Sequence, residues 1–171
     1  MAQLILTGFM GTGKTEVGRR LARATSRAFV DTDNLVEVAA KRSIPEIFAA
    51  EGEARFRSLE RDAVRQAVAV PDAVVATGGG ALLDPESRRL LLAAGPVVCL
   101  TATAEEILRR VDASGDRPLL AATSGTERLA KIRTLLEARE ASYRAATHRI
   151  DTTGRSVEDV VAEIRSLVGA E

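Results

Sequence analysis

Short apolar runs alternate along this chain with longer segments in which apolar residues recur every three or four positions. The short runs predict strands at 4–7, 28–31, 73–77, 97–100 and 149–151. The three-to-four spacing is that of a helix with one buried face. It predicts helices at 14–24, about 34–40, about 45–50, 53 to about 70, 85–93, 104–111, 127–145 and 157–168. This alternation predicts an α/β protein whose parallel sheet is covered by helices on both faces.

Glycine and acidic residues occur where the predicted strands end. Gly8, Asp31 and Gly78 each lie at or directly after the end of a predicted strand. In an open parallel sheet, ligands bind in the crevice beyond the carboxyl ends of the strands. We therefore expect three segments that are distant in the sequence to meet at one ligand site.

Composition narrows the class of protein. With 171 residues, 46% of them apolar, the chain is of the size of one domain, residues 1–171. Its 24 basic and 24 acidic side chains cancel, and only 3% of residues are aromatic, which disfavours binding to nucleic acid or to an anionic membrane. The chain shows neither a secretory signal nor an apolar run of membrane-spanning length, so we expect a cytoplasmic protein, and a monomer. The lone Cys99 lies in an apolar run and is expected to be a small buried hydrophobe.

The segment Gly8–Thr15 has the pattern of a phosphate loop, G-x-x-x-x-G-K-[ST], between a predicted strand and a predicted helix. Its glycines allow positive φ, so that consecutive N–H groups can surround a phosphate at the start of a helix. Lys14 can reach the β- and γ-phosphates, and the Thr15 hydroxyl is a hard oxygen suited to Mg²⁺. A glycine turn that only packs a helix on a strand would not require the Lys-Thr pair. The segment therefore predicts a nucleoside triphosphate site.

Two carboxylates follow the second predicted strand, in the segment Asp31-Thr32-Asp33. Alternation along an extended chain directs Asp31 and Asp33 to the same side and Thr32 to the other. One carboxylate could hold metal-bound water and the other a substrate hydroxyl. Alternatively, Asp33 only caps the helix that follows. The phosphate loop favours the first interpretation, because a kinase needs an acid to orient its acceptor and a carboxylate near its metal.

Two arginines interrupt apolar surroundings. Arg139 continues an apolar stripe on its helix, and a buried cation without a partner would cost several kcal/mol, so a carboxylate or an anionic ligand should meet it. Arg57 has Glu60 one turn further on, either as an orienting partner or as an ordinary ion pair on a solvated face.

Two glycine-containing segments also have more than one interpretation. The triplet 78–80 suits close approach of a ligand or of another backbone, but it is equally compatible with a flexible turn. The stretch 113–126 contains two glycines and a proline, and is long enough to form a lid.

Together these segments resemble shikimate kinase. The resemblance spans nearly the whole chain, through the phosphate loop, Asp31–Asp33, 44–48, 52–57, 77–80 and 117–120. It implies a three-layer P-loop NTPase fold of the nucleoside-monophosphate-kinase type, with a central five-stranded parallel sheet of order 2-3-1-4-5. It also implies a substrate-binding region at about 33–60 and a lid at about 113–125.

The resemblance implies transfer of the γ-phosphoryl of ATP, with Mg²⁺, to the 3-hydroxyl of shikimate, giving ADP and shikimate 3-phosphate in aromatic amino acid biosynthesis. The implied acceptor site comprises Asp33, Arg57, Gly78, Gly79, Gly80 and Arg139. The implied ATP site comprises Gly11, Thr12, Gly13, Lys14, Thr15, Glu16, Arg110, Arg117 and Arg155. Catalysis would rest on Asp33, Lys14 and Arg117, and Thr15 would hold the metal with Asp31, the latter through water.

Two other functions are compatible with a phosphate loop. The first is another small-molecule kinase of the same fold, acting on gluconate or a nucleoside monophosphate; Arg57, Arg139 and the glycine triplet argue against it. The second is a nucleotide-dependent switch or binding module without a small acceptor, which would have no use for the acceptor-facing residues.

Overall fold

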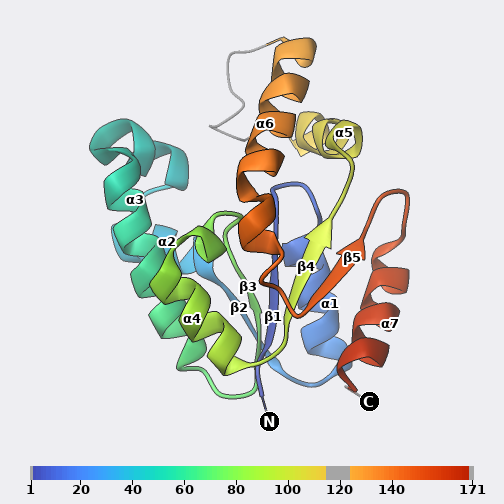
Figure 1. Cartoon of the computed structure of the whole chain (residues 1–171). Coiled ribbons are helices and arrows are strands. Elements are labelled where there is room, and N and C mark those ends of the chain that lie inside the picture. The colour runs from blue at the N-terminus through green and yellow to red at the C-terminus, as the bar shows by residue number, and fades with distance from the viewer. Residues whose placement is uncertain (1, 115–123, 170–171) are drawn as a thin grey trace.

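Five parallel strands form one sheet in the order β2-β3-β1-β4-β5 in the computed structural model, which describes residues 2–114 and 124–169 (Figure 1). The strands are β1 Leu4–Gly8, β2 Ala28–Asp31, β3 Ala73–Ala76, β4 Val97–Thr101 and β5 His148–Asp151. β1 lies at the centre and pairs in parallel with β3 on one side and β4 on the other. The predicted fold class and strand order are confirmed.

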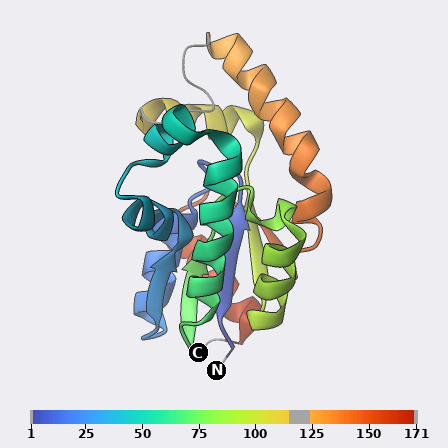
Figure 2. The same cartoon turned by 90° about the vertical axis from the view of Figure 1, so that its left-hand side faces the viewer.

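Helices cover both faces of the sheet and complete three layers (Figures 1 and 2). One face carries α1 and α7, and the other carries the C-terminal part of α3 together with α4 and α6. The helices are α1 Lys14–Ala24, α2 Thr32–Ala40, α3 Ile44–Val68, α4 Pro85–Ala94, α5 Ala104–Ser114, α6 Gly125–Tyr143 and α7 Val157–Val168, with a short 3₁₀ helix, η1, at Ala81–Leu83.

Alternation along β1 explains how one strand contributes to two cores. Leu4 and Leu6 pack with the apolar side chains of α1 and α7, whereas Ile5 packs with those of α3, α4 and α6. A strand buried on both faces needs apolar residues at every position, which is why it appears as a continuous apolar run. Each of these three side chains is at most 1% exposed, and such burial stabilises the fold by about 1.5–3 kcal/mol per side chain.

The helix α3 combines two of the predicted helices and carries a break between them. Gly52, with φ 79° and ψ 178°, is not helical, so the segment before it turns away from the segment after it. Ser43 starts α3 with a capping box, in which the Glu46 side chain accepts from the Ser43 N–H at 2.7 Å. The short helix η1 was not predicted, because three residues are too few to show a helical period.

Within the described ranges, the helices are all too short or too polar to cross a lipid bilayer.

Cys99 lies on β4 and is fully buried in the core between the sheet and the helices α3, α4 and α6. Burial raises the pKa of its thiol to about 11, against a smaller opposing effect of Arg149. The expectation of a small buried hydrophobe is confirmed. The buried, protonated thiol should be unreactive in the native state.

Cys99 should therefore act as a reporter of global unfolding. We expect an aromatic disulfide reagent at pH 8 to label the native protein at least ~10³-fold more slowly than the urea-unfolded chain, as follows from a stability of about 5 kcal/mol or more. The measurement is the labelling rate as a function of urea. Rapid labelling without denaturant would contradict a buried Cys99.

Candidate active site

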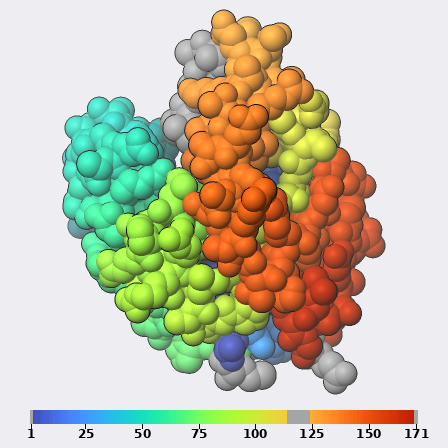
Figure 3. Space-filling model, in the orientation of Figure 1, coloured from blue at the N-terminus to red at the C-terminus, as the bar shows by residue number. Residues whose placement is uncertain are grey.

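A cavity of about 550 Å³ opens beyond the carboxyl ends of β1, β2 and β3. In the space-filling view, the surface is hollowed between α3 and α6 (Figure 3). The phosphate loop, the start of α2, the first half of α3 and the glycine triplet all contribute to its lining, together with Arg110 and Arg139. The segments that follow the first three strands therefore meet at one site, as the sequence pattern predicts.

The phosphate loop has the strained backbone that its glycines allow. Gly8, Gly11 and Gly13 have φ of 136°, 75° and 96°, and a Cβ at Gly8 would overlap the Leu100 carbonyl oxygen. No side chain caps the start of α1, so its first N–H groups are left for a ligand. Lys14 lies over the loop, where its Nζ donates to the carbonyl oxygens of Gly8 and Phe9 at 2.8 and 2.9 Å.

Two side chains hold the phosphate loop from behind. Arg110 donates to the Gly11 carbonyl oxygen at 3.1 Å, and the Thr152 hydroxyl shares its proton between the carbonyl oxygens of Thr101 at 3.0 Å and Thr12 at 3.2 Å. Arg110 also donates to the hydroxyl and carbonyl oxygens of Thr152, and Glu106 fixes its Nε at 2.8 Å. Because these carbonyls are bound away from the ligand, the N–H groups of the loop can face it. Sequence reasoning missed Thr152, whose only signal is a position just after a strand.

Three other residues predicted for the ATP site do not hold the phosphate loop in the described structure. Glu16 lines the cavity and pairs with Arg20 at 2.9 Å. Arg155 follows β5, where it pairs with Glu163 at 2.6 Å, and it is not part of the cavity lining. Arg117 falls outside the described residues. The roles assigned to all three stay predictions.

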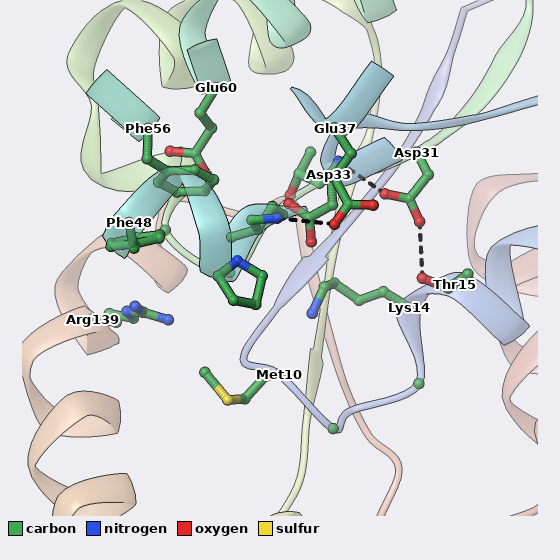
Figure 4. Close-up of a pocket in the computed structure, with 18 of the residues that line it drawn as sticks. Met10, Lys14, Thr15, Asp31, Asp33, Glu37, Phe48, Phe56, Glu60 and Arg139 are labelled. Atoms are coloured by element: carbon green, nitrogen blue, oxygen red, sulfur yellow. Dashed lines mark hydrogen bonds between the residues drawn. The ribbon is translucent and has the colours of Figure 1, made fainter. Parts of the chain in front are cut away.

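Asp31, and not Asp33, is the N-cap of α2. Its Oδ1 accepts from the Asp33 N–H at 3.0 Å, and its Oδ2 accepts from the Thr15 hydroxyl at 3.0 Å (Figure 4). The alternative in which Asp33 caps this helix is therefore wrong. The strand-like alternation assumed for this segment is also wrong, because the helix begins at Thr32. Asp31 and Asp33 nevertheless both line the cavity, while the buried Thr32 hydroxyl accepts from the Gly78 N–H at 3.1 Å.

Glu60 provides a buried carboxylate beside Asp33. Its side chain is 3% exposed, and its Oε2 accepts from Arg57 at 2.8 Å. Its Oε1 has no hydrogen-bond partner among the described residues. A Cβ added at Gly78 would lie 2.7 Å from this oxygen and 2.9 Å from Asp33 Oδ1. Glycine at this position therefore leaves room for two carboxylates at the wall of the cavity.

Arg57 lines the cavity and pairs with the buried Glu60, so the interpretation as an ordinary ion pair on a solvated face is wrong. Besides Glu60, it contacts Glu53 at 3.3 Å and lies 5.3 Å from the centre of the Phe56 ring. Burial disfavours its charge, but the carboxylates of Glu60 and Glu53 together more than offset this, so the pKa of Arg57 is raised. The ion pair holds a charged guanidinium at the wall of the cavity.

Arg139 is 6% exposed and lies on α6, facing the cavity from the side opposite Thr15 and Asp31 (Figure 4). Its guanidinium lies 5.1 Å from the centre of the Phe9 ring. Among the described residues, no carboxylate forms an ion pair with it. The sequence predicted either a protein carboxylate or an anionic ligand as the partner of Arg139. With no carboxylate paired to it among the described residues, the anionic ligand is the interpretation that stays.

The glycine triplet lies between the two arginines. A Cβ at Gly79 would be 3.0 Å from an Arg139 nitrogen, and a Cβ at Gly80 would be 2.5 Å from an Arg57 nitrogen. The Tyr143 hydroxyl donates to the Gly79 carbonyl oxygen at 2.7 Å. This close approach of side chains, and not a flexible turn, explains the three consecutive glycines.

Two aromatic rings form an apolar wall that sequence reasoning missed. Phe48 and Phe56 lie on either side of the break at Gly52, and their ring centres are 4.7 Å apart. Both line the cavity, as Figure 4 shows. The signal was weak, because only the direction of the chain at Gly52 brings the rings together.

The chain is similar to known proteins over nearly its whole length. The family model described as Shikimate kinase matches residues 10–168. Proteins named Shikimate kinase from Geobacter metallireducens and Thermus thermophilus are 52% and 49% identical, over 94% and 93% of this chain and 88% and 85% of their own lengths. A solved structure described as shikimate kinase from Acinetobacter baumannii in complex with shikimate has a TM-score of 0.92 and 36% identity, and the match covers 98% of this chain and 93% of that one.

The buried tyrosine beside this site predicts a loss of stability in alkali. Burial raises the pKa of Tyr143 to about 12, with Arg139 acting in the opposite direction. An unfolded tyrosine ionises near about 10, so the native state holds this proton more tightly and the contribution, on the order of 2 kcal/mol, is lost as pH rises from about 10 to about 12. We expect urea midpoints measured between pH 8 and 11 to fall less steeply for Tyr143→Phe. Parallel slopes for the two proteins would contradict this.

Proposed function

The chain belongs to the shikimate kinase family, and from this premise we propose a role for each half of the site. The protein uses ATP to phosphorylate a hydroxyl of shikimate. The observation that carries the assignment of roles is the pairing, in one cavity, of a phosphate loop with two arginines that face it. The first half binds the phosphoryl donor and the second binds a small acid bearing hydroxyl groups.

The donor half comprises the phosphate loop and its supports. The N–H groups of 11–15 surround the phosphates of ATP, and Lys14 and the start of α1 add positive charge. We assign Arg110 and Arg155 to the adenine, and Arg117 of the proposed lid at about 113–125 to the phosphates. Arg110 has a second task here, since it already holds the Gly11 carbonyl at 3.1 Å.

Mg²⁺ fits next to Thr15 and Asp31. Their side-chain oxygens are 3.0 Å apart at the cavity wall, and hard oxygens are the ligands that Mg²⁺ prefers. The described residues contain no cluster of three side chains able to hold a metal ion. Mg²⁺ needs none, because it completes its shell with water and phosphate oxygens. Thr15 would hold the ion directly and Asp31 would hold it through water, and the bound ion would supply positive charge beside the phosphates.

The acceptor half uses residues of the region 33–60 and the opposite wall. Asp33 binds the reacting hydroxyl, orients it towards the donor and receives its proton. Arg57 and Arg139 hold the carboxylate, for which planar guanidinium groups are well matched. The glycines 78–80 contact the ring hydroxyls, and the wall of Phe48 and Phe56 contacts the apolar ring. Phosphoryl transfer depends mainly on such positioning and on charge stabilisation.

A single chain supplies both halves of this site. We accordingly propose one kinase domain that acts as a cytoplasmic monomer, without nucleic acid or membrane partners. The neutral net charge of the chain supports the latter part of this proposal.

The substrate assignment predicts a clear ranking of acceptors. In a coupled ADP-release assay with Mg²⁺ and ATP, we expect turnover with shikimate and none above background with gluconate or AMP, because only shikimate combines a carboxylate with a ring that fits the aromatic wall. The reverse ranking would overturn the assignment. Turnover that no acceptor stimulates would instead favour a nucleotide switch.

Substitutions in the acceptor half should separate catalysis from binding. We expect Asp33→Asn to lower kcat by about 10²–10⁴-fold, the usual range for loss of a general base. Arg57→Ala and Arg139→Ala should mainly raise the KM for shikimate, by about 10- to 100-fold, since each removes a charged hydrogen-bond donor.

Each arginine has a neighbour that serves as a control. Arg61 on α3 pairs with Asp84 at 3.5 Å, and Arg144, the C-cap of α6, has a side chain that is 74% exposed and pairs with Glu140. Neither lines the cavity. Arg61→Ala and Arg144→Ala should leave the KM for shikimate within about twofold, since surface pairs contribute little. If Arg139→Ala behaves like Arg144→Ala, the proposed carboxylate site is wrong.

A further inference from the structure

Tyr143 lies at the end of α6, behind the cavity and not in its lining. It is 3% exposed, one helical turn beyond Arg139, and its hydroxyl donates to the Gly79 carbonyl oxygen at 2.7 Å. These two residues are 64 positions apart in the sequence. Neither the resemblance nor the proposed mechanism gives Tyr143 a task.

The glycine triplet keeps all its carbonyl oxygens occupied. Gly78 O accepts from the Ala81 N–H at 3.2 Å and Gly80 O accepts from the Leu83 N–H at 3.0 Å, while Gly79 O is held by Tyr143. The N–H groups of the triplet, in contrast, are only partly hydrogen-bonded among the described residues. The Gly78 N–H donates to Thr32, but those of Gly79 and Gly80 make no hydrogen bond within the described part of the chain. The triplet therefore has hydrogen-bond donors, and no free acceptors, to offer a ligand.

Only one of the three carbonyls depends on a side chain. Those of Gly78 and Gly80 are held by the local turns of η1, but that of Gly79 is held by a helix from a distant part of the sequence. In a trans peptide, the Gly79 carbonyl and the Gly80 N–H point in opposite directions. Binding the carbonyl from behind therefore directs the N–H away from Tyr143. A glycine peptide without this bond has little steric barrier against rotating.

Rotation of the Gly79–Gly80 peptide would weaken the binding of an anion between the two arginines. The peptide lies between Arg139, which is 3.0 Å from a Cβ position at Gly79, and Arg57, which is 2.5 Å from one at Gly80. A carbonyl oxygen turned towards these guanidinium groups would compete with an acceptor carboxylate for their donors. An N–H in the same place instead adds to the positive field, as in a backbone anion nest.

We propose that Tyr143 is a positioning residue of the acceptor site, which holds the Gly79–Gly80 peptide so that its N–H, together with Arg57 and Arg139, faces the oxygen atoms of the acceptor. This inference rests on the proposed acceptor site. It adds a buried hydroxyl, outside the cavity, on which acceptor affinity depends.

The conservative variant Tyr143→Phe tests this inference. It keeps the ring and removes the hydroxyl, which donates to the Gly79 carbonyl oxygen and also interacts with Arg139. We expect the KM for shikimate to rise about tenfold, the equivalent of one lost hydrogen bond, while kcat and the KM for ATP stay within about twofold. An unchanged KM for shikimate overturns the inference, and so does an equal rise in both KM values, which would indicate general loosening.

Two other variants isolate the cause. Thr152→Val also removes a buried hydroxyl, but on the donor side, where it lies 3.2 Å from the Thr12 carbonyl oxygen. It should raise the KM for ATP and leave that for shikimate unchanged. Arg139→Ala reports on the acceptor site itself. If it raises the KM for shikimate while Tyr143→Phe does not, only the role of Tyr143 fails; if neither does, the acceptor site fails as well.

The unmodified protein offers a second measurement. Tyr143 is the single tyrosine of the chain, which has no tryptophan, so intrinsic tyrosine fluorescence reports from this side chain alone. Titration with shikimate in the absence of nucleotide should change this fluorescence with the same Kd that calorimetry measures, and AMP at equal concentration should not. Calorimetric binding of shikimate with no change in fluorescence would contradict a hydroxyl coupled to the acceptor site.

Discussion

Parallel pairing of the central strand β1 with both neighbours is the constraint from which the rest of the structure follows. Because β3 and β4 run in the same direction as β1, their carboxyl ends lie at the same edge of the sheet, and β2 adds a fourth at that edge. The phosphate loop, Asp31 and the glycine triplet follow these strands, so the parallel pairing alone places them close together. Burial of β1 by two separate cores holds this edge in register, since a shift by one residue would exchange Leu6 with Ile5 between the cores.

The cavity shows how a half-buried cation, Arg57, and a buried one, Arg139, are tolerated in one small site. Arg57 is compensated within the protein by Glu60, with Phe56 beneath it, and is therefore held in place before any ligand arrives. The guanidinium of Arg139 lies against the Phe9 ring and the Tyr143 hydroxyl, and among the described residues no carboxylate pairs with it. The free energy spent in burying it is recovered only when an anion binds. In the proposed acceptor site, this asymmetry preorganises Arg57 and makes binding depend on a negatively charged group at Arg139.

In both halves of the proposed site, side chains from other elements bind backbone carbonyl oxygens of a glycine-containing segment. In the donor half, Arg110 and Thr152 bind the carbonyls of Gly11 and Thr12 from behind, and in the acceptor half Tyr143 binds that of Gly79. Each contact turns a peptide so that its N–H side is left for the ligand. Glycine makes these turns possible, but it cannot choose between the two orientations of a peptide. Side chains from other elements make that choice.

Local patterns alone determined much of this protein. Strand and helix periods, the spacing of Gly8–Thr15 and the apolar stripe interrupted by Arg139 are encoded by neighbouring residues, and they predicted the parallel sheet, the donor site and a buried cation in need of an anion. The tertiary structure decided which partner each group has. It made Asp31 the helix cap, brought Phe48 and Phe56 together across Gly52, and placed Thr152 and Tyr143 behind the ligand site. Those contacts join residues far apart in the chain, and a sequence pattern reports only the residues within a few turns of one another.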